Sequence, residues 1–244
     1  MSDNAFAREY LCDFAAAGDD QLISLTDVEM ASQRRYVERD FAGHAIVLGV
    51  DPARFGDDRS VIVKRRGPQV WPPIVLRGID NMQLASRVAY EIERTEADAC
   101  FVDQGAGSGV IDRLRQLGHN PVEVPFGGKA SDPTIYANRR TEMWCKLADW
   151  LRGGGAIPND HDLKLELSTP IYWFDAQNRR VLESKDDIKK RLQGGASPDI
   201  ADALALTFAA PVQSSNPGDV LTANALIRRQ QQRDRGSNPF RPRR

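Results

Sequence analysis

The stretch HAIVLGVDPARFGDDRSVIVKRR, from His44 to Arg66, decides the fold class of this chain. Its first half is an apolar run that ends in Asp51, as expected of a buried strand, and Pro52 keeps that aspartate in an extended conformation. The second half turns through residues 56–58 and continues as a second strand. The stretch therefore predicts a β-hairpin that carries a carboxylate at the end of a buried strand.

The segments that follow extend this hairpin into an α/β domain. The residues VWPPIVLRGID (70–80) read as a third strand, which Pro72 and Pro73 weaken or shift to an edge. Beyond it, apolar spacing and turn residues predict alternating helices and strands. The predicted helices cover 81–97, 110–118, 136–155, 161–169 and 196–210; the predicted strands cover 97–103 and 120–126, with a hairpin over 170–185. This order predicts a mixed β-sheet with helices on both faces.

Acidic residues stand at three separated positions where such a fold would bring them together. Asp51 ends the first strand, Asp103 ends the apolar run ACFV, and Asp199 and Asp202 lie in SPDIADALALTF. Open α/β sheets place their sites at the carboxyl ends of neighbouring central strands. Converging carboxylates repel one another and need cations between them, and hard oxygen ligands favour Mg²⁺ or Mn²⁺. Two such ions suit phosphodiester hydrolysis.

The four acids also have structural interpretations. Asp51 and Asp103 are each followed by turn-forming residues, so each could simply start a loop. Asp199 and Asp202 share a helical face, and Asp199 in the first turn would also complement the helix dipole. We expect that helix to begin with Ser197 as N-cap and Pro198 at its first position. Asp202 lies among apolar residues, and a buried acid there needs a partner such as a metal.

Other polar groups are candidates for supporting roles. We predict that Lys185 neutralises phosphate charge near the metals, and we interpret GAGSGV (105–110) as a flexible loop that lets phosphate or backbone approach. His161 could be a base or ligand, although a surface turn is its ordinary place, and Asp186 with Asp187 would cap a helix. The candidates for contacts with DNA are Lys129, Arg139, Arg140, Lys189 and Lys190.

The amino-acid composition limits the classes of protein to which this chain can belong. The 244 residues are 41% hydrophobic and 27% charged, as in ordinary globular proteins, and no apolar run is long enough to span a bilayer. Three cysteines without CxxC spacing argue for reduced thiols in a cytoplasmic setting. The net charge is −1, but seven arginines and only two aspartates lie beyond Gln213. This basic tail is compatible with a nucleic-acid partner.

An ordered set of motifs resembles the nuclease domain of the large terminase subunit of tailed bacteriophages. The resembling strings are GVDPARFGDDRSVIV, FVDQGAGSGVIDRL, NRRTEMWCKLADWLRGGGAIP and ESKDDIKKRLQGGASPDIADALAL, which together cover about residues 44–210. The segment FAREYLCDF resembles the one that joins the ATPase motor to the nuclease. The last motif, D-x-x-D-A-L, is also similar to that of Holliday-junction resolvases.

The resemblance implies an RNase H-like fold and two-metal cleavage of concatemeric double-stranded DNA during genome packaging. It places Asp51, Asp103 and Asp202 at metal-ligand positions and Asp199 at an adjacent acidic position. It implies an ATPase motor domain, a portal protein and a small terminase subunit as partners in the host cytoplasm, with no membrane. No P-loop string occurs in the chain. We therefore expect an extension or linker from an absent ATPase over 1–43, the nuclease domain over 44–212, and a flexible basic tail over 213–244.

Three other classes of protein share parts of this sequence pattern. A junction resolvase would share the same fold. An actin-like or sugar-kinase ATPase also begins with a strand, an aspartate and a hairpin, but usually requires a second comparable lobe. A docking module would use the basic tail to bind DNA, a portal or another packaging protein without catalysis.

Overall fold

The computed structural model describes residues 20–53, 59–192 and 197–215. A mixed sheet in the order β3-β2-β1-β5-β6 forms its centre, and β4 also pairs with β2. Strand β1 (Ile46–Asp51) is antiparallel to β2 (Arg59–Arg66) and parallel to β5 (Ala99–Asp103), which is parallel to β6 (Val122–Val124). The mixed α/β sheet predicted from the sequence is confirmed. The segment FAREYLCDF, the turn at 56–58 and the tail beyond residue 215 lie outside the described residues.

The predicted third strand is two strands. Strand β3 (Gln69–Val70) pairs with one end of β2, and β4 (Ile74–Arg77) pairs with the other. Pro72 and Pro73 lie between them, where they provide no N–H groups for a continuous ladder. The prolines therefore divide the predicted strand.

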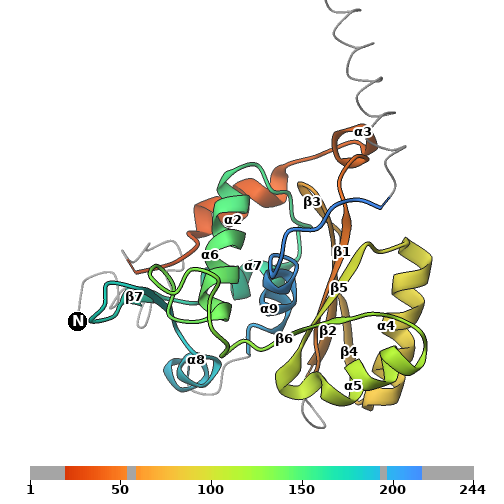
Figure 1. The fold of residues 1–244 in the computed structure, drawn as a ribbon. Coiled ribbons are helices and arrows are strands. Elements are labelled where there is room, and N and C mark those ends of the chain that lie inside the picture. Colours follow the sequence, from red (N-terminus) through yellow and green to blue (C-terminus); the bar gives the residue numbers. More distant parts are fainter. Residues whose placement is uncertain (1–19, 54–58, 193–196, 216–244) are drawn as a thin grey trace, which may run out of the picture.

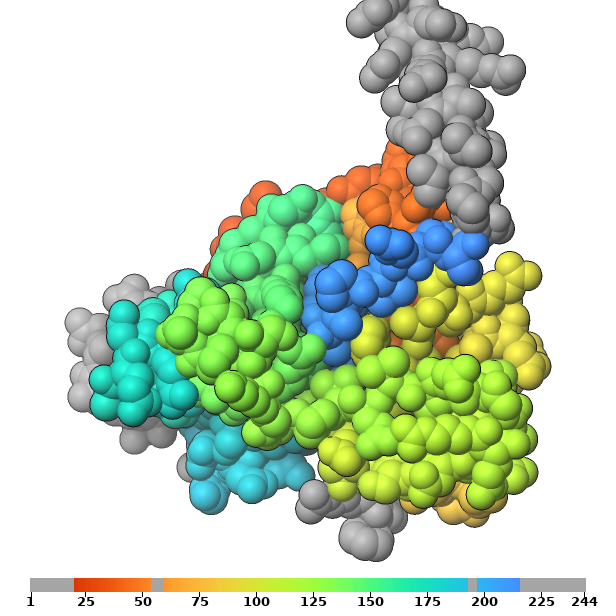
Figure 2. Space-filling model, in the orientation of Figure 1, coloured from red at the N-terminus to blue at the C-terminus, as the bar shows by residue number. Residues whose placement is uncertain are grey.

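Helices cover both faces of the sheet (Figure 1). Helices α4 (Asn81–Thr95) and α5 (Gln104–Gln116) pack on one face. Helices α2 (Leu25–Gln33), α6 (Arg139–Arg152), α7 (His161–Ser168) and α9 (Asp199–Leu206) lie on the other. The remaining described elements are α3 (Glu38–Phe41), the hairpin β7 (Tyr172–Phe174) and β8 (Arg180–Leu182), and α8 (Lys185–Arg191). In Figure 2 the residues after α9, in blue, run over the surface between α6 and α4.

Alternation along the central strands divides the core into two parts. Val47, Val61 and Phe101 belong to the cluster on the α9 side, whereas Leu48 and Val102 belong to the cluster under α4 and α5. Successive strand residues point to opposite faces, so each central strand supplies both cores. Asp51 follows Val47 by four residues and therefore faces α9.

The described part of the N-terminal segment is packed into the domain. Ser24 caps α2, where its hydroxyl accepts a hydrogen bond from the Asp27 N–H at 3.1 Å. Ile23 and Val28 are buried in the core on the α9 side. Among the described residues, none of the helices has the length and apolar character needed to cross a membrane.

Helix α9 lies directly on the central strand at Gly49. A Cβ atom at Gly49 would come within 1.9 Å of the carbonyl oxygen of Ala203. Only a residue without a side chain allows the backbones of β1 and α9 to approach this closely. This contact fixes the distance between Asp51 on the strand and the acids of the helix.

Gly49→Ala is therefore expected to destabilise the fold by about 3 kcal/mol or more, because the obstacle is backbone and α9 must move as a whole. Chemical denaturation followed by circular dichroism measures the change. Gly127→Ala is the matched control, since among the described residues no atom outside its chain neighbours lies within 4 Å of its Cβ position. An equal effect of both substitutions would contradict the close approach.

Candidate active site

Asp51 is brought to the candidate site by β1. Its side chain is buried, with 4% of its surface exposed, and its Oδ2 atom accepts a hydrogen bond from Lys185 Nζ at 2.8 Å. The β1–β5 register pairs Val50 with Val102, so Asp51 and Asp103 follow on neighbouring parallel strands. The predicted placement of both acids at the carboxyl ends of β1 and β5 is confirmed.

Helix α9 brings the other two acids from the opposite side. The helix begins at Asp199, with Pro198 at the N-cap position and no side-chain cap. The prediction that Ser197 is the N-cap and Pro198 the first helical residue is thus wrong by one position. Asp199 lies in the first turn as predicted, and Asp202 lies in the same turn.

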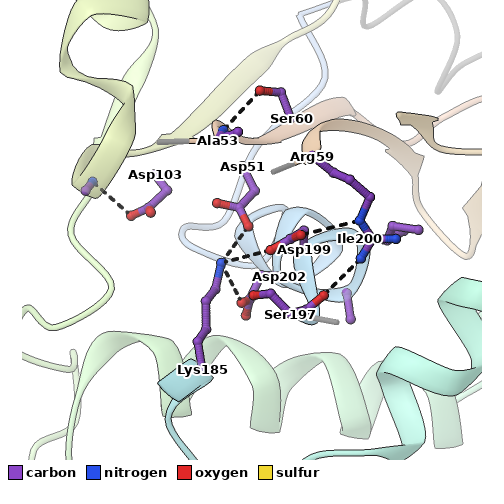
Figure 3. A network of polar contacts seen from close by, with 12 residues as sticks. Asp51, Ala53, Arg59, Ser60, Asp103, Lys185, Ser197, Asp199, Ile200 and Asp202 are labelled. Carbon is purple, nitrogen blue, oxygen red and sulfur yellow. Dashed lines mark hydrogen bonds and ion pairs between the residues drawn. The ribbon is translucent and has the colours of Figure 1, made fainter. Parts of the chain in front are cut away.

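The ammonium group of Lys185 lies where the three aspartates converge (Figure 3). Its Nζ atom is 2.8 Å from Asp51 Oδ2, 3.1 Å from Asp202 Oδ2 and 3.6 Å from Asp199 Oδ1. Lys185 is the first residue of α8, whose N-cap is Ser184. Three carboxylates from two distant segments thus share one cation.

Asp202 has more partners than its sequence context suggested. It is fully buried, and Oδ1 accepts hydrogen bonds from Arg140 Nε at 2.9 Å and Trp144 Nε1 at 2.6 Å. Arg140 also donates to Oδ2 at 3.3 Å and to the carbonyl of Glu183 at 2.7 Å. These groups satisfy the buried charge without a metal, so burial of Asp202 is not evidence for one.

The same contacts correct the prediction for Arg140. Its side chain is 9% exposed and its guanidinium is engaged by Asp202 and Glu183. A buried arginine held in this way has no reach to a DNA backbone, so we do not propose it as a DNA contact. Its guanidinium instead donates hydrogen bonds to both carboxylate oxygens of Asp202.

Burial and crowding of the acids shift their protonation in different directions. Burial raises the pKa of Asp51 to about 7; Lys185 opposes this rise, while Asp202 and Asp199 add to it. Burial alone would raise the pKa of Asp202, but Arg140 and Lys185 outweigh it, and the net shift is downward. Burial would lower the pKa of Lys185, but the three carboxylates raise it overall, so the lysine stays protonated.

Asp103 faces the same cleft but stands apart from the Lys185 cluster. The cleft has a volume of about 320 Å³, and its walls include Asp51, Asp103, Asp199 and Lys185. The Oδ1 atom of Asp103 accepts a hydrogen bond from the Gly105 N–H at 3.3 Å at the start of α5. As the side chains stand, no three His, Cys, Asp or Glu residues in the described part of the chain form a group that could hold a metal ion.

The glycine-rich segment after Asp103 is helical. Helix α5 begins at Gln104, so the interpretation of GAGSGV as a flexible loop is wrong. Asp103 supplies the N-cap that starts the helix. Close packing explains the glycine at position 107, because a Cβ atom there would lie 2.9 Å from Val102 Cγ1 and 3.1 Å from Pro52 Cγ.

The predicted DNA contacts divide by exposure. Lys129, Lys189 and Lys190 are exposed, and Lys189 lines the cleft. Arg139 is partly buried and binds Glu142 at 3.0 Å. His161 is exposed at the start of α7, outside the cleft lining.

Asp186 and Asp187 lie in the first turn of α8, but its N-cap is Ser184, so the prediction that they cap the helix is wrong. The Ser184 hydroxyl donates to Asp187 Oδ2 at 2.6 Å, while its oxygen accepts from the Asp187 N–H at 3.1 Å. The serine thus fixes the start of the helix that carries Lys185.

Arg59 and Glu166 are residues of the site that the sequence analysis missed. Arg59 lines the cleft, and its NH2 atom is 2.6 Å from Glu166 Oε1. Burial raises the pKa of Glu166 to about 7, although Arg59 and the N–H of Ala201 oppose the rise. The signal for Glu166 was its position between Leu163 and Leu167 on the buried face of a short helix. An acid on an apolar face indicates a specific buried partner.

The sheet and the site together define the class of fold. An antiparallel hairpin continues into parallel strands, and a late helix brings acids to their carboxyl ends, as in RNase H-like nucleases. Solved structures of this architecture include the nuclease domain of the large terminase subunit gp2 of bacterial virus Sf6. That match has a TM-score of 0.66 at 19% sequence identity and covers 78% of this chain and 99% of the Sf6 chain.

Two further matches are also large terminase nucleases. The large terminase nuclease of thermophilic phage G20c matches with a TM-score of 0.55 at 18% identity, over 78% of this chain and 98% of that one. The large terminase nuclease domain of Thermus phage P74-26 matches with a TM-score of 0.52 at 19% identity, over 75% and 93%. No family model and no curated protein matches the sequence. The resemblance indicated by the sequence motifs is confirmed as a likeness of fold to large terminase nuclease domains.

Metals accompany several of these related structures. A lysine-to-alanine mutant of the Sf6 domain was solved with calcium and with manganese. The G20c nuclease was solved with magnesium and with cobalt.

Proposed function

We propose that this chain is a divalent-metal-dependent endonuclease that cleaves double-stranded phage DNA during genome packaging. The observation that carries the proposal is the convergence of Asp51, Asp199 and Asp202 on a single cationic position beside a cleft. The fold shared with large terminase nucleases and the metals bound by those relatives support it.

The chemical type of the donor atoms, although not the present spacing of the described acids, suits hard divalent cations. Oxygen atoms of three carboxylates lie within 3.6 Å of the Lys185 ammonium, so a positively charged side chain already lies among these acids. Carboxylate oxygens are the ligands that Mg²⁺ and Mn²⁺ prefer. We propose Asp51, Asp199 and Asp103 on the cleft wall as ligands for one or two ions, with Asp202 behind them. Bound there, the ions would activate water and stabilise the leaving oxygen of a phosphodiester.

The chain's own residues would place the substrate and balance charge. Lys185 would share its carboxylates with the metal or turn towards the DNA phosphate. Lys189 at the cleft, with Lys129 and Lys190 on the exposed surface, would bind the backbone without reading sequence. Arg139 is a weaker candidate, because Glu142 already engages it. The ATPase motor, portal and small terminase subunit are the proposed partners in the host cytoplasm.

Cleavage of supercoiled plasmid by the purified chain in Mn²⁺ tests the function. We expect nicked and linear products with Mn²⁺ or Mg²⁺ and none with EDTA. Comparing linear DNA with four-way junctions separates the proposal from a resolvase, since marked preference for junctions would favour the latter. DNA binding without any metal-dependent cleavage would favour a docking module.

Lys185→Met is expected to increase the stabilisation that Mn²⁺ gives the folded chain. The substitution keeps the apolar stem but removes the ammonium that competes with a metal for Asp51 and Asp199. A ligand at 100 times its dissociation constant stabilises by about 2.7 kcal/mol, so the thermal midpoint reports affinity. Lys190→Met on the same helix is the control, and an unchanged Mn²⁺ response in Lys185→Met would contradict the shared position.

A further inference from the structure

The start of α9 is held by a buried ion pair from two other elements. Arg59 comes from the first residue of β2 and Glu166 from α7. Their side chains are 8% and 7% exposed, and Arg59 NH2 is 2.6 Å from Glu166 Oε1. Neither residue is one of the four acids of the proposed metal site, and neither is its lysine.

Glu166 caps a helix that has no cap of its own. The first N–H groups of any α-helix lack partners within the helix, and Pro198 at the N-cap of α9 makes no side-chain bond. Glu166 Oε2 accepts hydrogen bonds from the N–H groups of Ile200 at 2.7 Å and Ala201 at 3.0 Å. A carboxylate from α7 thus fixes the first turn of α9, in which Asp199 and Asp202 lie.

Arg59 connects this cap to the cleft, and Figure 3 shows its side chain next to Asp199 and Ser197. Its NH2 atom also donates to the carbonyl of Ser197 at 2.9 Å, and its Nε atom lies 3.5 Å from Asp199 Oδ2. The other oxygen of Asp199 is 3.6 Å from Lys185 Nζ. The carboxylate of Asp199 is therefore placed between two cations, one of which Glu166 holds.

We propose that Glu166 and Arg59 are positioning residues that set the place of Asp199 for metal binding. The inference rests on the proposed function, since it assigns Asp199 to the metal. Outer partners that orient a ligand typically contribute a factor of about 10–100 in metal affinity. The two oxygens of Glu166 serve α9 and Arg59 separately, so a side chain with one oxygen cannot serve both.

The test measures Mn²⁺ affinity without DNA, by titration calorimetry on the full chain. Glu166→Gln and Arg59→Lys are each expected to raise the dissociation constant for Mn²⁺ about 10–100-fold. Glu91→Gln is the matched control: Glu91 is equally buried and paired with Arg87 and Arg94, but it lies on α4. The control is expected to lose stability and to keep its Mn²⁺ affinity.

A second readout is the Mn²⁺ concentration that half-activates plasmid cleavage. For Glu166→Gln we expect this concentration to rise while the rate at saturating Mn²⁺ stays close to that of the unsubstituted chain. Wild-type Mn²⁺ affinity in both folded variants, or weakened affinity in the Glu91 control as well, would overturn the proposal. If Glu166→Gln does not fold, Arg59→Lys decides by the same criteria.

Different experimental results would refute the proposed nuclease function and the proposed positioning role of Glu166. An unsubstituted chain that binds Mn²⁺ without cutting DNA would refute the nuclease but leave the affinity test of Glu166 decisive. A chain that cuts DNA while Glu166→Gln binds Mn²⁺ normally would refute the positioning role alone. A chain that binds no Mn²⁺ would refute both.

Discussion

Asp51→Asn is expected to reduce Mn²⁺-dependent cleavage of supercoiled plasmid by at least about a hundredfold. Metal ions supply several kcal/mol of transition-state stabilisation, and about 1.4 kcal/mol corresponds to a factor of ten in rate. Asparagine keeps the shape of Asp51 but removes the charge that Lys185 contacts at 2.8 Å. Gel analysis of nicked and linear products over time measures the effect.

The matched control is Asp112→Asn, the same substitution on an exposed acid of α5 outside the cleft lining. It is expected to cut at the rate of the unsubstituted chain. Cleavage by Asp51→Asn at an undiminished rate would remove Asp51 from the site. Asp202 is a poorer choice for this experiment, because its replacement also leaves Arg140 without its buried partner.

Local patterns were sufficient to predict most of the framework. The apolar runs before Asp51 and Asp103 indicated two buried strands, and open-sheet geometry then placed both acids at the same edge. The spacing of Leu84 and Val88 predicted α4 with its buried face. These features depend on residues close together in the chain, where periodicity carries the information.

Long-range partners were beyond the reach of the same reasoning. Asp202 was correctly predicted to be buried, and a metal was named as an example of the partner it would need. The sequence could not show that Arg140, 62 positions away, is such a partner. Glycine content suggested a loop at Gly105–Val110, whereas packing of Gly107 against Pro52 and capping by Asp103 favour a helix. In each case a tertiary contact decided what local propensity left open.

The buried ion pair of Asp202 and Arg140 is expected to contribute to the stability of the fold in a way that mutation can measure. Removing one partner of a buried ion pair typically costs about 3–5 kcal/mol, because the other charge remains desolvated. Replacing both by apolar residues of similar volume is often neutral. The pair therefore has a specific signature: loss of one partner should be worse than loss of both.

Arg140→Met is accordingly expected to lower the free energy of unfolding by about 3 kcal/mol, at the lower end of that range, since Lys185 and Trp144 still contact Asp202. Adding Asp202→Leu should recover part of the loss, as a double-mutant cycle in denaturant would show. Arg65→Met is the control: this arginine bonds Thr207 and forms no ion pair with a described carboxylate, so its loss should cost less. Additive losses in the cycle would mean that Arg140 stabilises the fold through packing, and Asp202 would then need another source of counter-charge.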